Sequence, residues 1–172
     1  MKQRILVERT RNELGEPLVN FPKVSSKSEW VDLFTSQECV LNAPQAGTLR
    51  GHDVKHRDVV SEVTYIPLGV SLRLPEGFEA VVALRNPVAK SIGVMPASGI
   101  VVFDGNHPAN NEQWTYPVVS LRKTSIAKNT RLCQFRIQPS QKATVWQKLR
   151  WLLTSGIEFV EIDQAAETAE NV

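Results

Sequence analysis

Short runs of apolar residues, separated by polar and turn-forming residues, recur through the centre of the chain, which is typical of a protein built from short β-strands. One run covers residues 3–8, and further runs rich in Val, Ile, Leu and Phe follow from residue 59 onward, separated by Pro, Gly and Asn. The later runs cover residues 59–66, 69–74, 79–84, 99–103, 118–122 and 131–137. Short strands at this spacing predict a mostly β domain, an antiparallel β-sandwich or jelly roll.

Two short segments before residue 100 predict helices instead. Ser26-Lys27-Ser28-Glu29 matches a capping box, so we expect a helix over residues 27–36. Its apolar face would contain Trp30, Leu33 and Phe34. Farther along, Asn86 can cap a helix and Pro87 suits its first position, which predicts a short helix over residues 86–91.

After residue 140 the apolar period becomes helical, and we expect a helix over residues 143–155 that ends near Gly156. Its apolar face contains Val145, Leu149, Leu152 and Leu153, widened by Trp146 and Trp151. We expect this face to pack on the chain's own sheet, and the alternative is that it binds a protein partner. Over residues 157–163 apolar and polar side chains alternate with a period of two, which predicts an edge strand. Residues 164–172 form an acidic tail.

The composition of the 172 residues, 42% hydrophobic and 22% charged, indicates a single globular domain over residues 1–172. The net charge is +2, and the basic residues are interspersed with acidic ones along the chain. This distribution predicts no specific nucleic-acid binding. No apolar run is long enough for a signal peptide or a membrane span. Cys39 and Cys133 lack metal-ligand spacing, so we expect a reduced, cytoplasmic protein in which Cys133 is a small core residue.

Four short segments stand out in order along the chain: GHDV at 51–54, RNPVAKSIGV at 85–94, VFDGNH at 102–107 and NTRLCQ at 129–134. Together they resemble the motifs of the trimeric dUTPase (deoxyuridine triphosphatase) family. The family has A-G-Y-D-L, R-S-[SG]-L-A-x-K-x-G-V, T-I-D-x-D-Y and G-D-R-I-A-Q at these places. The resemblance covers a family core at about 45–140 and leaves the helices at 27–36 and 143–155 as additions.

The resemblance implies a Mg²⁺-dependent pyrophosphohydrolase that converts dUTP or a related deoxynucleotide to the monophosphate and pyrophosphate. Asp104 would orient and deprotonate the attacking water, and Gln134 would hold that water or a phosphate oxygen. Asp53 would act on Mg²⁺ indirectly, through water. Substrate-binding roles fall to Arg85, Asn86, Ser98, His107 and Arg131.

The same residue types also have structural interpretations that the sequence leaves open. Asp53 can form an Asx turn beside a glycine, and Asp104 precedes Gly105-Asn106, a strong hairpin sequence. Arg85 can be a surface ion-pair partner. His107 precedes a proline and can be an exposed loop residue rather than a ring stacked beneath the deoxyribose.

In the family, the third motif of one subunit meets the other motifs of a neighbour. The resemblance therefore implies a homotrimer in which a lone chain has no complete site. The strand at 157–163 would be one that neighbouring subunits can exchange. The related dCTP deaminases share the fold but need a glutamate after the third motif. That place falls near Trp114, which does not favour deamination.

Departures from the family pattern support a second hypothesis, that the protein binds without catalysis. Asn86 and Pro87 replace serines that contact phosphate, and proline has no amide hydrogen to donate. Ser98 replaces an asparagine that reads the base, and the glycine-rich C-terminal motif has no counterpart. The alternative is a divergent member of this superfamily, of viral or mobile-element type, that binds a nucleotide or uses its Trp-containing helices to bind a protein partner.

Overall fold

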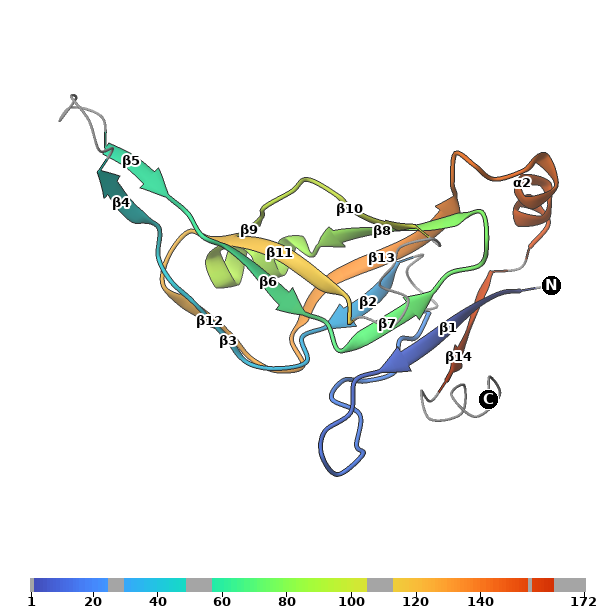
Figure 1. Cartoon of the computed structure of the whole chain (residues 1–172), viewed down its shortest axis with the longest axis horizontal. Coiled ribbons are helices and arrows are strands. Elements are labelled where there is room, and N and C mark those ends of the chain that lie inside the picture. The colour runs from blue at the N-terminus through green and yellow to red at the C-terminus, as the bar shows by residue number, and fades with distance from the viewer. Residues whose placement is uncertain (1, 25–29, 49–56, 105–112, 155, 163–172) are drawn as a thin grey trace, which may run out of the picture.

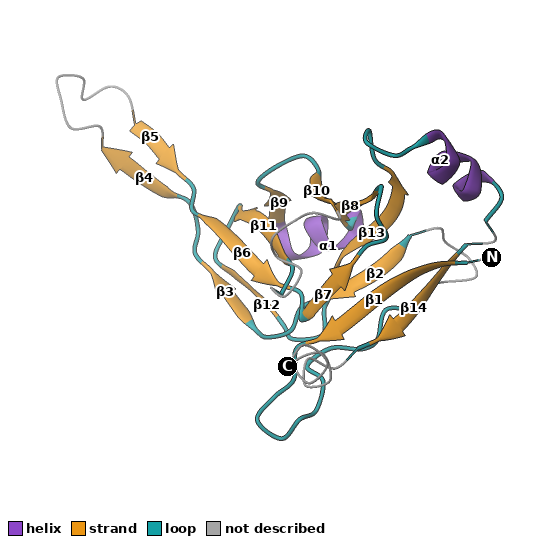
Figure 2. Ribbon diagram, turned by 45° about the vertical axis from the view of Figure 1, so that its right-hand side comes forward, coloured by secondary structure: helices purple, strands orange, loops and turns teal. Residues whose placement is uncertain are grey.

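The protein is built from short β-sheets, with one helical segment among the strands and a second helix at one end of the molecule (Figures 1 and 2). A computed structural model of the chain describes residues 2–24, 30–48, 57–104, 113–154 and 156–162. One sheet has the order β14-β1-β7, with β1 (Gln3–Arg9), β7 (Val70–Arg73) and β14 (Ile157–Glu161). A four-stranded sheet has the order β10-β8-β13-β2, with β2 (Val31–Phe34), β8 (Phe78–Leu84), β10 (Val101–Asp104) and β13 (Arg131–Pro139).

The remaining strands form smaller sheets. A three-stranded sheet has the order β6-β11-β9, with β6 (Val63–Pro67), β9 (Val94–Pro96) and β11 (Thr115–Ser120). Two ribbons pair β12 (Thr124–Ile126) with β3 (Cys39–Leu41), and β4 (Gln45–Thr48) with β5 (Arg57–Val60). The β4–β5 ribbon reaches away from the other strands, at the far left of Figure 1.

The hydrophobic core lies between the sheets because alternate residues of each strand point inward. Fully or nearly buried side chains come from several strands, including Ile5, Val7, Val70, Leu72, Ala80, Val82, Phe135 and Ile137. Burial of such side chains is the main source of stability in a domain of this size. The predicted β-sandwich is therefore confirmed, and all the strand-forming runs predicted from residue 59 onward overlap an observed strand.

The predicted helix over residues 27–36 is wrong where the structure describes it. Val31–Phe34 is the strand β2, paired antiparallel with β13. Val31 and Leu33 are buried while Asp32 and Phe34 are partly exposed, which is a period of two rather than the expected helical face. A capping-box sequence is a weak local preference, whereas pairing with a central strand satisfies the backbone and buries both apolar side chains. The folded core consequently begins well before residue 45.

A short helical segment follows β8, as predicted. It consists of α1 (Asn86–Val88) and the π-helical turn η1 (Ala89–Gly93). Arg85, in an extended conformation, occupies the N-cap position, and its side chain makes no capping bond. Asn86 is therefore the first helical residue rather than the cap.

The helix α2 (Val145–Leu152) lies within the predicted range of 143–155. Thr144 is its N-cap: the Thr144 hydroxyl accepts from the Gln147 amide, and the Gln147 side chain accepts from the Thr144 amide. Such a reciprocal arrangement satisfies two amides at the helix start. Figure 1 shows α2 at the right-hand end of the molecule, beyond the end of β13.

The packing of α2 differs from our expectation. Trp151 packs edge-on against Phe78, with ring centroids 5.4 Å apart, and so attaches the helix to the start of β8. The expected core-facing side is instead exposed: Val145 80%, Trp146 78%, Leu149 42%, Leu152 79% and Leu153 76%. The helix is attached through a neighbouring face, and periodicity alone does not tell which face meets the sheet.

This attachment predicts different effects for two tryptophans of one helix. We expect Trp151→Ala to lower the free energy of unfolding by about 2 kcal/mol, less than for a fully buried ring because Trp151 is half-buried. Trp146→Ala, at an exposed position, should change it by less than about 0.5 kcal/mol. Urea titration of both variants checks this, and equal effects would contradict the observed packing.

The C-terminal strand β14 pairs in parallel with β1 of the same chain, with Gln3 opposite Ile157 and Val7 opposite Glu161. The strand predicted at 157–163 therefore forms over Ile157–Glu161, at the edge of the β14-β1-β7 sheet. Its partner β1 belongs to the same chain. The predicted acidic tail at 164–172 lies outside the described residues. Across the described part of the chain, we find no helix with the length and apolarity that crossing a membrane requires.

Candidate functional site

A cluster of charged side chains lies where β2, β8 and β13 meet. Arg85 Nη1 donates a hydrogen bond to Asp32 Oδ1, and Arg131 Nη1 donates to Asp32 Oδ2 at 3.4 Å. The Asp32 and Arg85 side chains are 29% and 28% exposed, so the pair is partly shielded from solvent. One carboxylate therefore contacts two guanidinium groups: it fixes the partly shielded Arg85, whereas Arg131 is 61% exposed and makes a longer, more open contact.

Gln134 belongs to the same face of the four-stranded sheet. It lies opposite Asp32 on one side and Ala83 on the other, and directly opposite residues of antiparallel strands point to the same face. Two residues beyond Ala83 along the chain comes Arg85, just after β8 ends. The structure thus brings together three of the predicted site residues, Arg85, Gln134 and Arg131.

Buried Tyr116 fixes the end of β8 beside this cluster. Its hydroxyl accepts a hydrogen bond of 3.0 Å from the Leu84 amide, one residue before Arg85. The Arg85 amide in turn donates to the Leu132 carbonyl at 3.1 Å. Burial raises the pKa of Tyr116, so this phenol stays protonated and neutral. The backbone that carries Arg85 is therefore positioned from two sides.

Asp104 lies at the opposite end of the same sheet face. It is the last residue of β10 and pairs with Glu79 at the start of β8. From Glu79 to Arg85 the chain advances six residues along β8, a distance of about 20 Å in an extended strand. A general base must lie within about 3 Å of the proton that it removes. Within one chain, Asp104 and the arginine cluster therefore cannot act on the same phosphate group.

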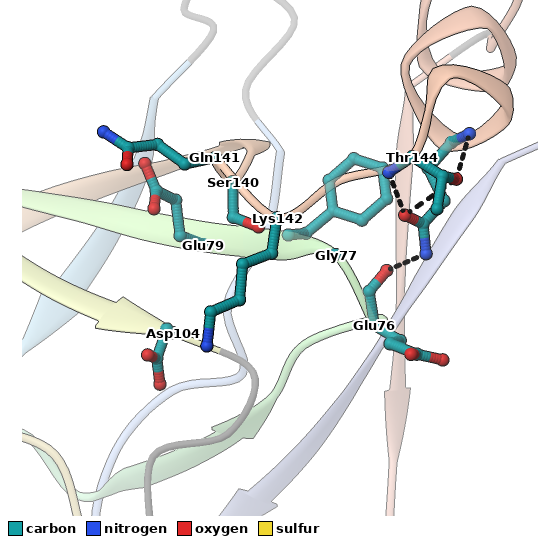
Figure 3. Close-up of a pocket in the computed structure, with 10 residues that line it drawn as sticks. Glu76, Gly77, Glu79, Asp104, Ser140, Gln141, Lys142 and Thr144 are labelled. Carbon is teal, nitrogen blue, oxygen red and sulfur yellow. Dashed lines mark hydrogen bonds between the residues drawn. The ribbon is translucent and has the colours of Figure 1, made fainter.

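A hollow of about 330 Å³ opens beside Asp104 (Figure 3). It is lined by Glu76, Gly77, Phe78, Glu79, Asp104, Ser140, Gln141, Lys142, Thr144 and Gln147. The Glu79 carboxylate accepts from Gln138 Nε2 at 2.7 Å. Asp104 itself is exposed to this hollow, as a residue that contacts a ligand or a neighbouring subunit would be.

The other predicted site residues are less defined. Asn86 starts α1 and Ser98 follows β9, and both are exposed. Asp53 and His107 lie outside the described residues. Of the described His, Cys, Asp and Glu residues, no three come together in a group that could hold a metal ion. Cys133 is fully buried, which raises the pKa of its thiol far above the ordinary value, so it is a core residue as predicted.

Comparison with known proteins decides the family. No family model matches the chain. The chain is 31% identical over 117 residues to the SPbeta prophage-derived deoxyuridine 5'-triphosphate nucleotidohydrolase YosS of Bacillus subtilis (strain 168), covering 68% of this chain and 70% of that protein. The chain belongs to the dUTPase family.

Solved dUTPase structures share its fold. The Streptococcus mutans dUTPase superimposes with a TM-score of 0.56 at 15% identity, covering 72% of this chain and 88% of that one. The Staphylococcus bacteriophage 80alpha dUTPase gives a TM-score of 0.58 at 12% identity, covering 82% and 93%. A point mutant of the dUTPase from the S. aureus phage phi11, described with a structural Mg(II) ion, gives 0.57 at 14% identity, covering 82% and 94%.

Asp32 joins the arginine cluster but was not among the site residues predicted from the sequence. The first dUTPase motif ends in Tyr-Asp-Leu, and this chain has Val31-Asp32-Leu33 in β2, where both the Asp and the Leu match. The GHDV segment that we aligned with this motif lacks the leucine. It falls between β4 and β5, a ribbon that belongs to a separate two-stranded sheet. The signal was present, but the helix predicted over residues 27–36 concealed it.

Proposed function

We propose that this protein is a deoxynucleoside triphosphate pyrophosphohydrolase that converts dUTP or a related deoxynucleotide to the monophosphate and pyrophosphate. One observation carries the proposal: Asp32 holds Arg85 and Arg131 beside Gln134, on the sheet face that also presents Asp104. In a dUTPase-family chain, the Asp104 carboxylate can activate water. The arginines and the Gln134 amide can bind phosphate. The chemistry needs little more, because phosphoryl transfer depends mainly on positioning and electrostatics.

Each residue then has a distinct role. Asp104 orients the attacking water at the α-phosphorus and accepts its proton. Arg85 and Arg131 neutralise phosphate oxygens, and their forked geometry suits two oxygens at once. Gln134 holds the water or a phosphate oxygen without adding charge. Asp32 positions Arg85, which leaves the guanidinium oriented before the substrate arrives.

Mg²⁺ enters this scheme bound to the triphosphate. Magnesium prefers oxygen ligands, retains several waters and often uses only one or two carboxylates, so a protein cage of ligands is unnecessary. Asp32 is the carboxylate that stands among the phosphate-binding arginines. We therefore assign to Asp32, rather than to Asp53, the carboxylate role of the first motif near the metal.

The separation of Asp104 from Arg85 supports a site shared between subunits. If the Asp104 end of one chain meets the arginine cluster of the next, both groups reach one phosphate, and threefold repetition closes the assembly. Contact surfaces are available for such an assembly. The outer face of the β6-β11-β9 sheet is apolar, with Val63 43%, Tyr65 65% and Met95 50% exposed. In the strand register, Val119 lies between Val63 and Met95, and Pro117 lies opposite Tyr65, which makes the patch continuous.

A trimer is the expected state in solution. Light scattering at micromolar concentration should give three times the 19.2 kDa mass of one chain. Because Tyr65 and Met95 lie in the apolar patch, Tyr65→Glu combined with Met95→Glu should lower the mass, since a buried unpaired carboxylate is costly. Leu14→Glu is the control, because Leu14 is 84% exposed outside this sheet and should leave the mass unchanged. A monomeric wild type would rule out the shared site.

Release of pyrophosphate tests the activity directly. With Mg²⁺, the protein should release pyrophosphate from dUTP, or from one of the other four common deoxynucleoside triphosphates, and a metal chelator should stop the reaction. A thermal-shift screen with the same nucleotides measures binding independently. If no nucleotide is hydrolysed, while one of them raises the melting temperature, the protein binds nucleotide without catalysis.

A second candidate function is binding of a protein partner, and the exposed face of α2 favours it. Five large apolar side chains on one short helix form a patch that soluble proteins usually cover. An apolar helix or strand of another protein would fit such a surface. If this hypothesis holds, the Trp146 side chain becomes buried when the partner binds. The hydrolase hypothesis predicts no change in the exposure of Trp146.

A further inference from the structure

The hollow beside Asp104 has an unfavourable charge for a nucleotide unless one residue compensates. Of the described residues that line it, Glu76, Glu79 and Asp104 carry carboxylates, and Lys142 carries the one cation. A triphosphate that reaches Asp104 is itself an anion, so these carboxylates repel it. Figure 3 shows the Lys142 side chain directed toward Asp104 across the hollow.

The backbone at Lys142 is held in place over this hollow. Residues 140–143 form a turn in which the Ala143 amide donates to the Ser140 carbonyl at 3.1 Å. The Ser140 amide donates to the Gly77 carbonyl at 2.8 Å, which ties the turn to the start of β8. On the other side Ala143 is only 7% exposed, so it is packed into the protein. Lys142 therefore extends from an anchored turn, although its own side chain is exposed.

The start of α2 strengthens this anchor. Gln147 Nε2 donates to the Glu76 carbonyl at 3.1 Å, which joins the helix to the turn before β8. Gly77 has a φ of +80°, and a Cβ there would lie 2.5 Å from Gln147 Oε1. Only glycine permits this backbone conformation and close contact without strain. The position of Lys142 beside Asp104 is thus built into the contact between α2 and β8.

We propose that Lys142 is a substrate-binding residue that pairs with the phosphate group nearest Asp104. This inference rests on the proposed function, because it takes a deoxynucleoside triphosphate as the ligand. The Lys142 ammonium offsets the carboxylates of the hollow and allows the phosphate to approach the water held by Asp104. The anchored turn and helix α2 act as the element that presents this cation to the site.

Matched lysine variants test the proposal. Lys142→Met should weaken binding of the non-hydrolysable α,β-imido analogue of dUTP about tenfold, as loss of a charge-assisted contact does. The affinity for deoxyuridine, which has no phosphate, should stay the same. Lys142→Arg should restore most of the loss. Lys148→Met is the control, because Lys148 is exposed on α2 and does not line the hollow, and it should change neither affinity.

The outcomes separate this inference from the proposed function. If the wild type binds the analogue but hydrolyses no nucleotide, the hydrolase proposal fails, and the Lys142 inference stands on the affinities alone. If Lys142→Met binds the analogue as tightly as wild type does, or loses equal affinity for deoxyuridine, the Lys142 inference is wrong. In active protein, a rise in KM with nearly constant kcat for Lys142→Met would agree with a binding role, and an unchanged KM would overturn it.

Discussion

Asp104→Asn is expected to lower kcat at least about 100-fold, because the amide cannot accept the proton of the attacking water. Asparagine has nearly the same size and can still take part in hydrogen bonds. Binding of the non-hydrolysable nucleotide should therefore remain within about threefold of wild type. Steady-state pyrophosphate release and titration calorimetry measure the two effects separately.

A matched carboxylate provides the control for this experiment. Glu158 is exposed on β14, where its ion pair with Arg4 is long, at 3.8 Å, and open to solvent. Glu158→Gln removes the same charge and should leave turnover unchanged, since exposed pairs contribute little. A loss of turnover in both variants would point to a general charge effect. Full turnover in Asp104→Asn would mean that another group activates the water.

Two inactive variants are expected to restore activity when they are mixed in one trimer. Arg85→Gln removes the phosphate-binding charge but keeps a donor for Asp32, and Asp104→Asn removes the general base. If every site takes Asp104 from one subunit and Arg85 from the next, random mixing leaves about one quarter of the sites intact. Turnover should then return to about a quarter of the wild-type value.

The mixing experiment has a clear opposite outcome. If Asp104 and Arg85 act within the same chain, each chain carries one defect, and no mixture restores activity. Such a result would contradict both the shared site and the separation of about 20 Å along β8 from which we infer it. Mixed trimers can be prepared by co-expression with two affinity tags, and trimers of a single variant serve as the baseline.

Much of the sheet architecture follows from the sequence. The apolar-rich runs at residues 3–8, 79–84 and 131–137 predict the strands β1, β8 and β13, which form the centre of the fold. The resemblance to dUTPase motifs predicts Arg85, Gln134 and Arg131 as site residues, and the structure places them together. Local pattern succeeds here because a short run rich in β-branched and other apolar residues, bounded by turn residues, favours a strand wherever it pairs.

The place of Asp32 beside the arginines could not be predicted in this way. The capping-box sequence at 26–29 predicts a helix, and the strand β2 forms instead because β13 offers it a partner about 100 residues away. Pairing across that distance is invisible to a local pattern. Asp32 comes into contact with Arg85 only through this pairing.

The sequence by itself therefore determined the strand-forming segments, the place of α2 and the family to which the motifs belong. Only the tertiary structure decided that residues 31–34 form a strand, that Asp32 joins the arginines, and that the turn before α2 directs Lys142 toward Asp104. It also decided that Asp104 and Arg85 lie at opposite ends of β8. The physical reason is that backbone preference and hydrophobic period act between near neighbours, whereas proximity of charged side chains depends on which distant strands share a sheet.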